Sequence, residues 1–336
     1  MSTESQGGKM LVQKLLQRVS MLACPKCHSR NMTIRQVLRY CTSSPSNAPI
    51  YKLKSRGIVR VKGPDTLSFL QGLVTSDVES LGSVMGVQYS MLLNVQGRVL
   101  YDLLLYDVAQ IFGEKAVFVE CDRNMAQQLI TDIKKYKIRK KVSLEDVSDS
   151  HSVYATVSDK GGHLIELASA TVETQDPRVP DFGLRIISDK ELAGVVEDES
   201  GYHESRLQWG IPEGPQDLPP GNCFPLESNL VFMNGVSFSK GCYLGQELTA
   251  RTHHTGVTRK HVMPLIFEKP PGDIESGESI RNEKNKNVGK FRSSCRAFGL
   301  GLMRTNEVAG ELYVTSKTGD TVKLKTVIPN WWPESS

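Results

Sequence analysis

The sequence predicts an α+β fold that ends in a small β-barrel. Strands and helices are grouped, and neighbouring strands are joined by short hairpins, which favours α+β over a doubly wound parallel sheet. After about residue 260 the pattern changes to short strands separated by glycine turns, which is typical of a small separate barrel. We therefore expect folded domains at residues 50–259 and 260–336, preceded by an N-terminal segment of residues 1–49.

In the first half of residues 50–259 the sequence predicts four strands and two helices. A turn centred on Gly97 joins two apolar strands into a hairpin. Pro64 lies in the first turn of one helix, and Asn124 is expected to cap the other. The predicted elements are strands 58–61, 89–94, 99–106 and 116–121, a helix from residue 65 and a helix from residue 124 to about 136.

The second half continues with strands, two helices and one long irregular segment. A helix over residues 199–209 ends at Gly210, and a further helix is expected over residues 246–251. The segment 214–225 is rich in Pro and Gly, and loops of that length are usually functional or mobile. The remaining predicted strands are 153–158, 164–167 and 182–187, followed in the barrel by 288–292, 300–303, 312–314 and 322–327.

Residues 1–49 have the composition of a mitochondrial transit peptide followed by a linker. They contain seven Lys or Arg residues and one acid, Glu4, and the apolar residues between positions 11 and 22 recur at helical spacing. A basic, acid-poor, amphipathic N-terminus is typical of import into mitochondria. We therefore expect these residues to be removed on import and the protein to work in the mitochondrial matrix.

The charge and composition of the remaining chain exclude several classes of protein. Residues 50–336 carry 34 basic and 36 acidic residues, whereas a nucleic-acid binder needs a basic excess on its folded surface. No apolar run approaches the roughly 18 residues that a membrane-spanning helix requires. The seven scattered cysteines form no disulfide framework, which favours a reducing compartment. The densest basic run, residues 137–141, is interpreted as a solvated strand edge, with an anion contact as the alternative.

Cys242 is the residue whose sequence neighbours most clearly favour chemical reactivity. It follows Lys240 and Gly241 and precedes a predicted helix at Gln246. A nearby ammonium group and a helix N-terminus both favour a thiolate, the form that binds soft metals or attacks electrophiles. A small buried cysteine is the alternative interpretation. The sequence therefore indicates either a reactive thiolate or a core residue.

Two kinds of chemistry could use this thiolate. His253 or His254 could act as the general base of a cysteine hydrolase, but the spacing does not fix that geometry. An iron–sulfur cluster usually needs about four thiolate-type ligands, and Cys121, Cys223 and Cys295 share no motif with Cys242. Cys242 could therefore be one ligand of a cluster whose other ligands come from a partner or from small thiols.

Several motifs resemble one protein family. Residues 240–247, Lys-Gly-Cys-Tyr-Leu-Gly-Gln-Glu, resemble the signature of the YgfZ-like proteins, which are relatives of the folate-dependent aminomethyltransferase (T-protein) of glycine cleavage. Residues 69–75, 93–102 and 288–291 resemble the first helix, the hairpin and the C-terminal barrel of that family. Residues 225–230 and the tail 329–333 are most similar to its mitochondrial iron–sulfur cluster assembly members.

The resemblance implies a fold and a function. The fold would consist of T-protein-like mixed α/β domains around a central cavity, with the barrel at the C-terminal end. The protein would be a non-enzymatic factor that supports the maturation of [4Fe–4S] proteins together with A-type iron–sulfur carrier proteins, and Cys242 would be the shared cluster ligand or transfer thiolate. Folate-dependent aminomethyl transfer is the alternative function.

Tetrahydrofolate is the second cofactor that the resemblance implies. The positions expected to contact a pterin are Asn94, Asp102, Glu227, Gln246 and Glu247. Two departures from the transferases weaken this interpretation. Tyr101 stands where they have the first of two paired acids, and Gln208 stands where they have a glutamate, so a general base and a counter-charge for a cationic folate intermediate are both missing.

Overall fold

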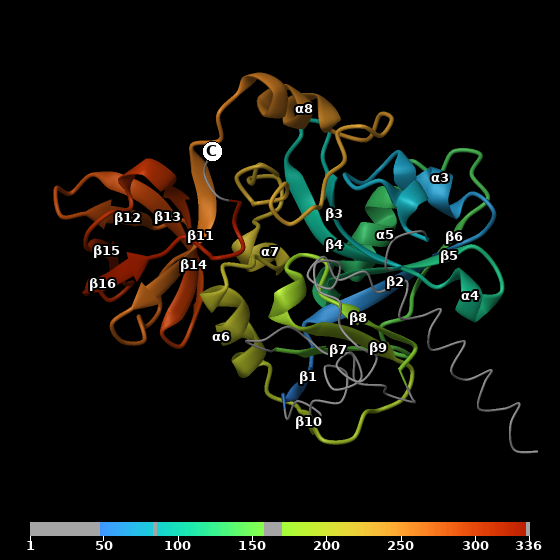
Figure 1. Ribbon diagram of the computed structural model, residues 1–336, viewed down its shortest axis with the longest axis horizontal. Coiled ribbons are helices and arrows are strands. Elements are labelled where there is room, and N and C mark those ends of the chain that lie inside the picture. Colours follow the sequence, from blue (N-terminus) through green and yellow to red (C-terminus); the bar gives the residue numbers. More distant parts are fainter. Residues whose placement is uncertain (1–47, 83–85, 158–169, 334–336) are drawn as a thin grey trace, which may run out of the picture. The chain divides into compact units, whose positions relative to one another are not determined.

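The first layer of the fold is a five-stranded antiparallel sheet. The structure, a computed structural model, describes residues 48–82, 86–157 and 170–333. The strand order is β3-β4-β5-β2-β6 (Figure 1). The strands are β2 (Arg56–Lys62), β3 (Val87–Leu93), β4 (Val99–Asp107), β5 (Ala116–Asp122) and β6 (Ser143–Asp146). The predicted hairpin is confirmed, since β3 and β4 pair along their whole length.

Alternating apolar side chains bury both faces of this sheet. Leu103 and Leu105 of β4 point to one face, where they pack with the helices α3 (Thr66–Gln71) and α5 (Ala126–Lys134). Leu104 and Tyr106 point to the other face. Because successive side chains of a strand point in opposite directions, a strand buried on both faces is largely apolar, and β4 is so except for Asp102 and Asp107. Short 3-10 turns lie at Val78–Ser80 and Arg123–Met125.

The second layer is another five-stranded sheet, of order β10-β1-β7-β9-β8. Its residues Val153 and Ile187 share a core with Leu104 and Tyr106 of the first sheet, so the two sheets pack face to face. Among the described strands of this sheet, β1 and β10 pair in parallel and the other neighbours are antiparallel. The strands are β1 (Ile50–Lys52), β7 (Ser152–Thr156), β8 (Val172–Gln175), β9 (Leu184–Ser188) and β10 (Val195–Val196).

The predicted C-terminal barrel is confirmed as a closed six-stranded barrel of order β11-β14-β13-β12-β15-β16. Its interior holds Met263, Leu265, Phe291 and Leu324, which are almost fully buried. The first strand begins at Lys260, where the sequence places the start of the barrel. The strands are β11 (Lys260–Phe267), β12 (Ser279–Asn282), β13 (Asn287–Cys295), β14 (Phe298–Arg304), β15 (Leu312–Thr315) and β16 (Thr321–Thr326).

Helices and long turns join the sheets to the barrel. Helix α6 (Ser200–Gln208) contacts β11, β13 and β14, and the short α7 (Gly214–Asp217) contacts β4, β5 and β13 (Figure 1). The indole of Trp331, beyond the last strand, donates to the carbonyl oxygen of Trp209 at 2.7 Å. The described residues from Ala48 onward form one compact unit, so their division into two domains stays a prediction. None of the helices in the described ranges is long and apolar enough to cross a membrane.

Four local predictions need correction or lie outside the described residues. Asp122, not Asn124, caps the turn before α5, because its carboxylate accepts from the backbone N–H of Asn124. Residues 214–217 are helical, not irregular. Residues 137–141 form a loop between α5 and β6, not a strand edge. The predicted hairpin around residues 160–163 lies outside the described residues.

Candidate functional site

Cys242 lies in an exposed loop that leads into helix α8 (Gln246–Thr255). Cys121 and Cys223 are buried and Cys295 is half-buried, so Cys242 is the exposed one of the four cysteines in the described part of the chain. Burial raises the pKa of the thiols of Cys121, Cys223 and Cys295, which keeps them protonated. The buried-core alternative for Cys242 is therefore wrong.

The loop before Cys242 is anchored to the segment that follows α3. Lys240 Nζ donates to the carbonyl oxygens of Val74 at 2.8 Å and Ser76 at 2.6 Å. Burial lowers the pKa of Lys240 to about 8. The N–H of Leu244 donates to the carbonyl oxygen of Gly72. The sequence suggests that the Lys240 ammonium group stabilises a thiolate at Cys242. In the structure this group holds the loop in place.

The loop after Cys242 is fixed by Gln246 and Gly245. Gln246 Oε1 accepts from the N–H of Tyr243 at 2.9 Å, and its Nε2 donates to Cys242 Sγ at 3.9 Å. Gly245 has φ 75°, a left-handed conformation that favours glycine. It also lies directly against the tip of the β3–β4 hairpin, since a Cβ at this position would approach Asn94 O to 2.3 Å. The structure thus brings the Cys242 motif and the Asn94 hairpin together.

Gly245→Ala is expected to lower the free energy of unfolding by about 2 kcal/mol or more, since the left-handed backbone and the contact with Asn94 both oppose a side chain. Urea unfolding measures this change. Gly241→Ala is the matched control, because a Cβ at Gly241 meets nothing within 4 Å. A change of less than about 0.5 kcal/mol for both variants would show that the hairpin does not hold this turn.

The side-chain oxygens of Asn94 and Asp102 have hydrogen-bond partners within the chain. Asn94 Oδ1 accepts from the N–H groups of Gln96 and Arg98 and so closes the hairpin turn. Asp102 is buried, and its two carboxylate oxygens accept from Arg56 Nη1 at 3.2 Å and from the N–H of Gly214 at 3.0 Å. Both side chains therefore have structural partners.

Asp102 belongs to a buried network of ion pairs that sequence reasoning missed. Arg185 pairs with Glu120, Asp176 and Glu213, and Arg178 pairs with the last two of these acids. Burial raises the pKa of Glu213, but the facing arginines outweigh it and hold that pKa well below its usual range. We define the buried ion network as Arg56, Asp102, Glu120, Asp176, Arg178, Arg185, Tyr202 and Glu213.

Glu227 and Glu247 lie apart from this network. Glu227 lines a cavity of about 320 Å³ together with Leu248 and Thr252 of α8, and its carboxylate lies 3.5 Å from Lys260 Nζ. Glu247 is exposed in the first turn of α8. A second cavity, of about 430 Å³, is lined by Tyr89, Asn234 and other residues, but by none of the five residues predicted to bind a pterin.

None of the three cavities of about 320, 390 and 430 Å³ is lined by more than one of the five predicted pterin contacts. Asn94 and Gln246 lie at the Cys242 loop, Asp102 is in the buried ion network, and Glu227 lines a different hollow. A pterin ring needs free donors and acceptors, whereas Asn94 Oδ1 and both carboxylate oxygens of Asp102 already accept hydrogen bonds within the chain. This arrangement adds no support for tetrahydrofolate binding, and the role of the five residues in it stays a prediction.

The histidines of α8 make aromatic contacts instead of a catalytic pair. The rings of His253 and Phe238 stack with centroids 3.7 Å apart, and His254 meets the same phenylalanine edge-on. In the described ranges, the structure records no hydrogen bond from either imidazole to Cys242. This arrangement gives no support to a cysteine hydrolase.

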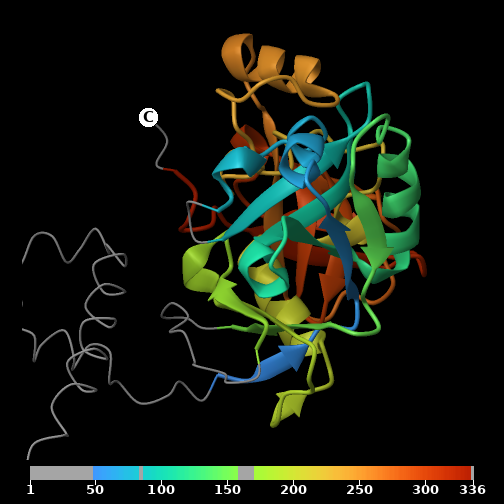
Figure 2. The same ribbon diagram turned by 90° about the vertical axis from the view of Figure 1, so that its right-hand side faces the viewer.

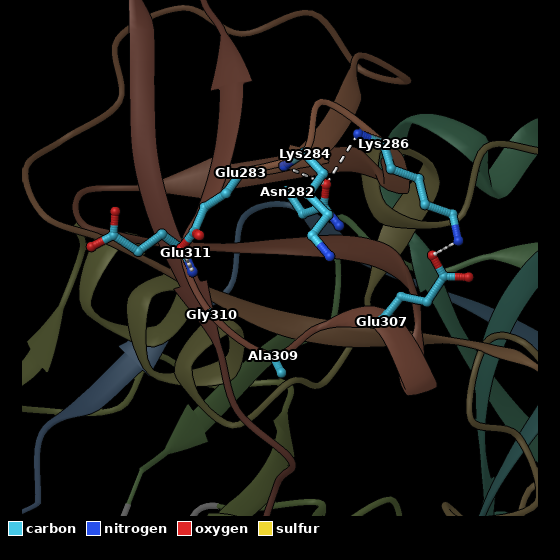
Figure 3. Close-up of a pocket in the computed structure, with 8 residues that line it drawn as sticks. All are labelled: Asn282, Glu283, Lys284, Lys286, Glu307, Ala309, Gly310 and Glu311. Atoms are coloured by element: carbon cyan, nitrogen blue, oxygen red, sulfur yellow. Dashed lines mark hydrogen bonds and ion pairs between the residues drawn. The ribbon is translucent and has the colours of Figure 1, made fainter.

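Metal ligands do not gather anywhere in the described residues, which contain no group of three or more His, Cys, Asp or Glu side chains placed to hold a metal ion. A third cavity, of about 390 Å³, lies on the barrel and is lined by lysines and glutamates, with an ion pair of 2.7 Å between Lys286 and Glu307 (Figure 3). It contains no predicted site residue. Cys242 is thus an exposed thiol in a fixed loop and belongs to no metal-binding group of three or more such side chains within the described residues.

Comparison with known proteins identifies the family. Residues 259–334 match the family described as the CAF17 C-terminal beta-barrel domain. The mouse protein named iron-sulfur cluster assembly factor IBA57, mitochondrial, is 38% identical over 85% of this chain and 86% of its own length. The human protein of the same name is 36% identical over 94% of this chain and 93% of its own.

A solved structure confirms the fold. The glycine cleavage system aminomethyltransferase T from Bartonella henselae superposes with a TM-score of 0.64 over 89% of this chain and 90% of its own, at 15% identity. This similarity confirms the predicted T-protein-like architecture, and the matched barrel confirms its C-terminal part. With more than a third of its residues identical to those of curated relatives over most of its length, the chain belongs to the family of the mitochondrial iron–sulfur cluster assembly factor IBA57.

Proposed function

We propose that this chain supports iron–sulfur cluster assembly in the mitochondrial matrix by presenting Cys242 as one thiolate ligand of a shared cluster. The other ligands come from a partner, an A-type carrier protein, and the cluster passes on to recipient [4Fe–4S] proteins. The observation that carries the proposal is the exposure of Cys242 in a loop whose two sides are fixed.

The absence of nearby ligands supports a shared cluster over a self-contained one. Clusters are held by about four thiolate-type ligands, and no group of three metal-binding side chains occurs among the described residues. One exposed thiol can complete the coordination of a cluster that another protein already holds. The names of the curated relatives, which are iron–sulfur cluster assembly factors, support the same function.

The chemistry at Cys242 is a ligand exchange. The thiol loses its proton to solvent, the thiolate sulfur forms a bond to iron, and a ligand supplied by the partner leaves. No electron is transferred in this step. Gln246, whose amide donates to Cys242 Sγ, can donate in the same way to the thiolate and so stabilise the ligating form.

Two side chains weigh against the alternative, aminomethyl transfer. Tyr101, which replaces an acid of the transferases, donates to Asp132 at 2.7 Å and leaves no free base at that position. Gln208, which replaces a glutamate of the transferases, is exposed on α6 and carries no charge to offset a cationic folate intermediate. We therefore propose a non-enzymatic assembly factor, and no step of this function passes through tetrahydrofolate.

The test is anaerobic mixing of the full chain with an A-type carrier protein that holds an iron–sulfur cluster. We expect one complex in size-exclusion chromatography, in which both proteins elute together with the visible absorbance of the cluster. If the absorbance stays with the carrier while the chain elutes separately and colourless, the proposal is wrong.

A further inference from the structure

The loop between α5 and β6 combines a high positive charge with exposed apolar side chains. Residues 134–141, which comprise the last residue of α5 and the start of the loop after it, read Lys-Lys-Tyr-Lys-Ile-Arg-Lys-Lys. They contain six cations and no acid, although residues 50–336 as a whole carry slightly more acids than bases. Ile138 is 78% exposed and Tyr136 is 42% exposed. We call residues 134–141 the basic loop. This short segment is therefore strongly positive, although the chain from residue 50 onward is close to neutral.

The backbone of the basic loop is compact and well defined by hydrogen bonds. The N–H of Tyr136 donates to Ile133 O, and the N–H of Lys140 donates to Lys137 O. Arg139, with φ 59°, reverses the chain direction after Ile138. The loop is anchored on both sides, by the buried Ile133 before it and the buried Val142 after it. Ile138 is thus held in solvent at the centre of a turn.

Few acids compensate the cations of the basic loop. Asp132 pairs with Lys135 at 2.6 Å and also accepts from Tyr101. Asp65 accepts from the backbone N–H of Lys141, and Lys140 Nζ donates to Ser68. In the described part of the chain, no ion pair is recorded for Lys134, Lys137 or Arg139. These three cations remain available to a partner.

We propose that the basic loop binds the surface of an anionic phospholipid bilayer, with Ile138 inserted between headgroups and the surrounding cations at the lipid phosphates. Clusters of four to eight Lys or Arg residues on a protein surface are typical of binding to anionic lipids. An apolar side chain among such cations adds hydrophobic insertion to the electrostatic attraction. The basic loop supplies both contributions, and this inference does not rest on the role of Cys242.

An exposed apolar side chain surrounded by cations favours a bilayer over a protein or a nucleic acid as the partner of the basic loop. The loop follows α5, which packs on the outer side of the first sheet (Figures 1 and 2). A protein partner would need a pocket for Ile138 and acids around it, whereas a bilayer offers an apolar interior below an anionic surface everywhere. Nucleic acid offers phosphates but no apolar layer for Ile138.

The first test uses a local fluorescence readout in the full chain. Ile138→Trp is mixed with vesicles of phosphatidylcholine that contain one-third phosphatidylglycerol, with bromine on the acyl chains as a quencher. The chain already contains three tryptophans, so the fluorescence of the unchanged chain under the same conditions is subtracted. We expect the remaining fluorescence, which comes from the introduced tryptophan, to be at least halved, with no quenching by vesicles of brominated phosphatidylcholine alone. The basic residues 1–49 are identical in every variant, so binding through them does not by itself quench a tryptophan at this position.

Val257→Trp is the matched control, because Val257 is 79% exposed but lies outside the basic loop. Its fluorescence is expected to change little. Equal quenching of both variants, or no quenching of Ile138→Trp, would overturn the proposal. In the latter case, salt-dependent binding of the same chain to a polyglutamate peptide would assign the loop to an acidic protein partner instead.

The second test removes charge from the basic loop. Replacing Lys134, Lys137 and Arg139 by Gln in the Ile138→Trp chain is expected to raise the lipid concentration for half-maximal quenching about ten-fold or more, since each cation contributes about five-fold near an anionic surface. Replacing the exposed barrel lysines Lys269, Lys284 and Lys290 by Gln makes the same charge change and is expected to have little effect. Equal effects of the two sets would contradict the proposal.

Discussion

Cys242→Ser is expected to abolish the cluster-containing complex between this chain and an A-type carrier. A serine hydroxyl is not deprotonated at neutral pH and is a poor ligand for the soft iron–sulfur core, so the coordination that bridges the two proteins is lost. Anaerobic size-exclusion chromatography with absorbance detection measures the loss. Because Cys242 is exposed, its replacement is expected to change the free energy of unfolding by less than about 0.5 kcal/mol.

Cys295→Ser is the control for this prediction. Cys295 is half-buried and its thiol contacts the carbonyl oxygen of Ser200, a bond that a hydroxyl can also make. The complex and its absorbance are expected to persist in this variant. A complex of Cys242→Ser that retains the full cluster absorbance would show that another residue of the chain is the ligand.

Cells add a second readout of the same substitution. If Cys242 is the shared ligand, [4Fe–4S] enzymes are expected to lose activity in cells whose only copy of this chain carries Cys242→Ser, while the chain itself accumulates normally. Normal maturation of these enzymes would contradict the assembly role of the thiol, even if the complex in solution were lost. The two readouts therefore separate binding of the cluster from its delivery.

The parts of the fold that the sequence predicted correctly depend on local signals. The β3–β4 hairpin has apolar strands on both sides of a turn at Gly97, and α6 has an end signal at Gly210. A turn at Cys242 could be proposed because glycines lie on both sides of the cysteine in the sequence, whereas its exposure stayed open until the structure showed it. Such signals act over a few residues, and a pattern in the chain records them directly.

The buried ion network could not be predicted in the same way. Its members come from strands, turns and helix α6 between residues 56 and 213, and the pairing of Arg185 with Glu120 and Glu213 exists only once the two sheets have packed. An arginine within a strand is otherwise expected to be exposed. The predicted pterin role of Asp102 likewise came from a motif, whereas the structure adds its bond to Arg56.

The largest effect on stability is expected from Arg185→Met in the buried ion network. Methionine has a similar length but no charge, so Glu120, Asp176 and Glu213 lose a shared cation while fully buried. Breaking a buried pair by removing one partner typically costs about 3–5 kcal/mol, because the remaining charges stay without compensation. Urea unfolding at neutral pH, followed by circular dichroism, measures this loss.

Arg123→Met is the matched control for a surface ion pair. Arg123 pairs with Asp149 at 2.6 Å, but its side chain is 40% exposed and that of Asp149 is 98% exposed. Solvent screens such a pair, and we expect a loss of about 1 kcal/mol or less. Equal losses for Arg185→Met and Arg123→Met would show that burial does not strengthen the network.

The stability loss caused by Arg185→Met is expected to depend on pH. Burial raises the pKa values of Asp176 and Glu213, but the facing arginines outweigh it and hold both below their usual range. A carboxylate with a lowered folded-state pKa stabilises the fold at neutral pH, and this contribution is lost as the pH falls through that pKa. Without Arg185 the pKa values of these acids are lowered less, so the acids become protonated at a higher pH as the solution is acidified. The difference in the free energy of unfolding between the unchanged chain and Arg185→Met is therefore expected to narrow below pH 4.5, the ordinary pKa of glutamate. A difference that grows with acidification would contradict the assignment of these acids as the partners of Arg185.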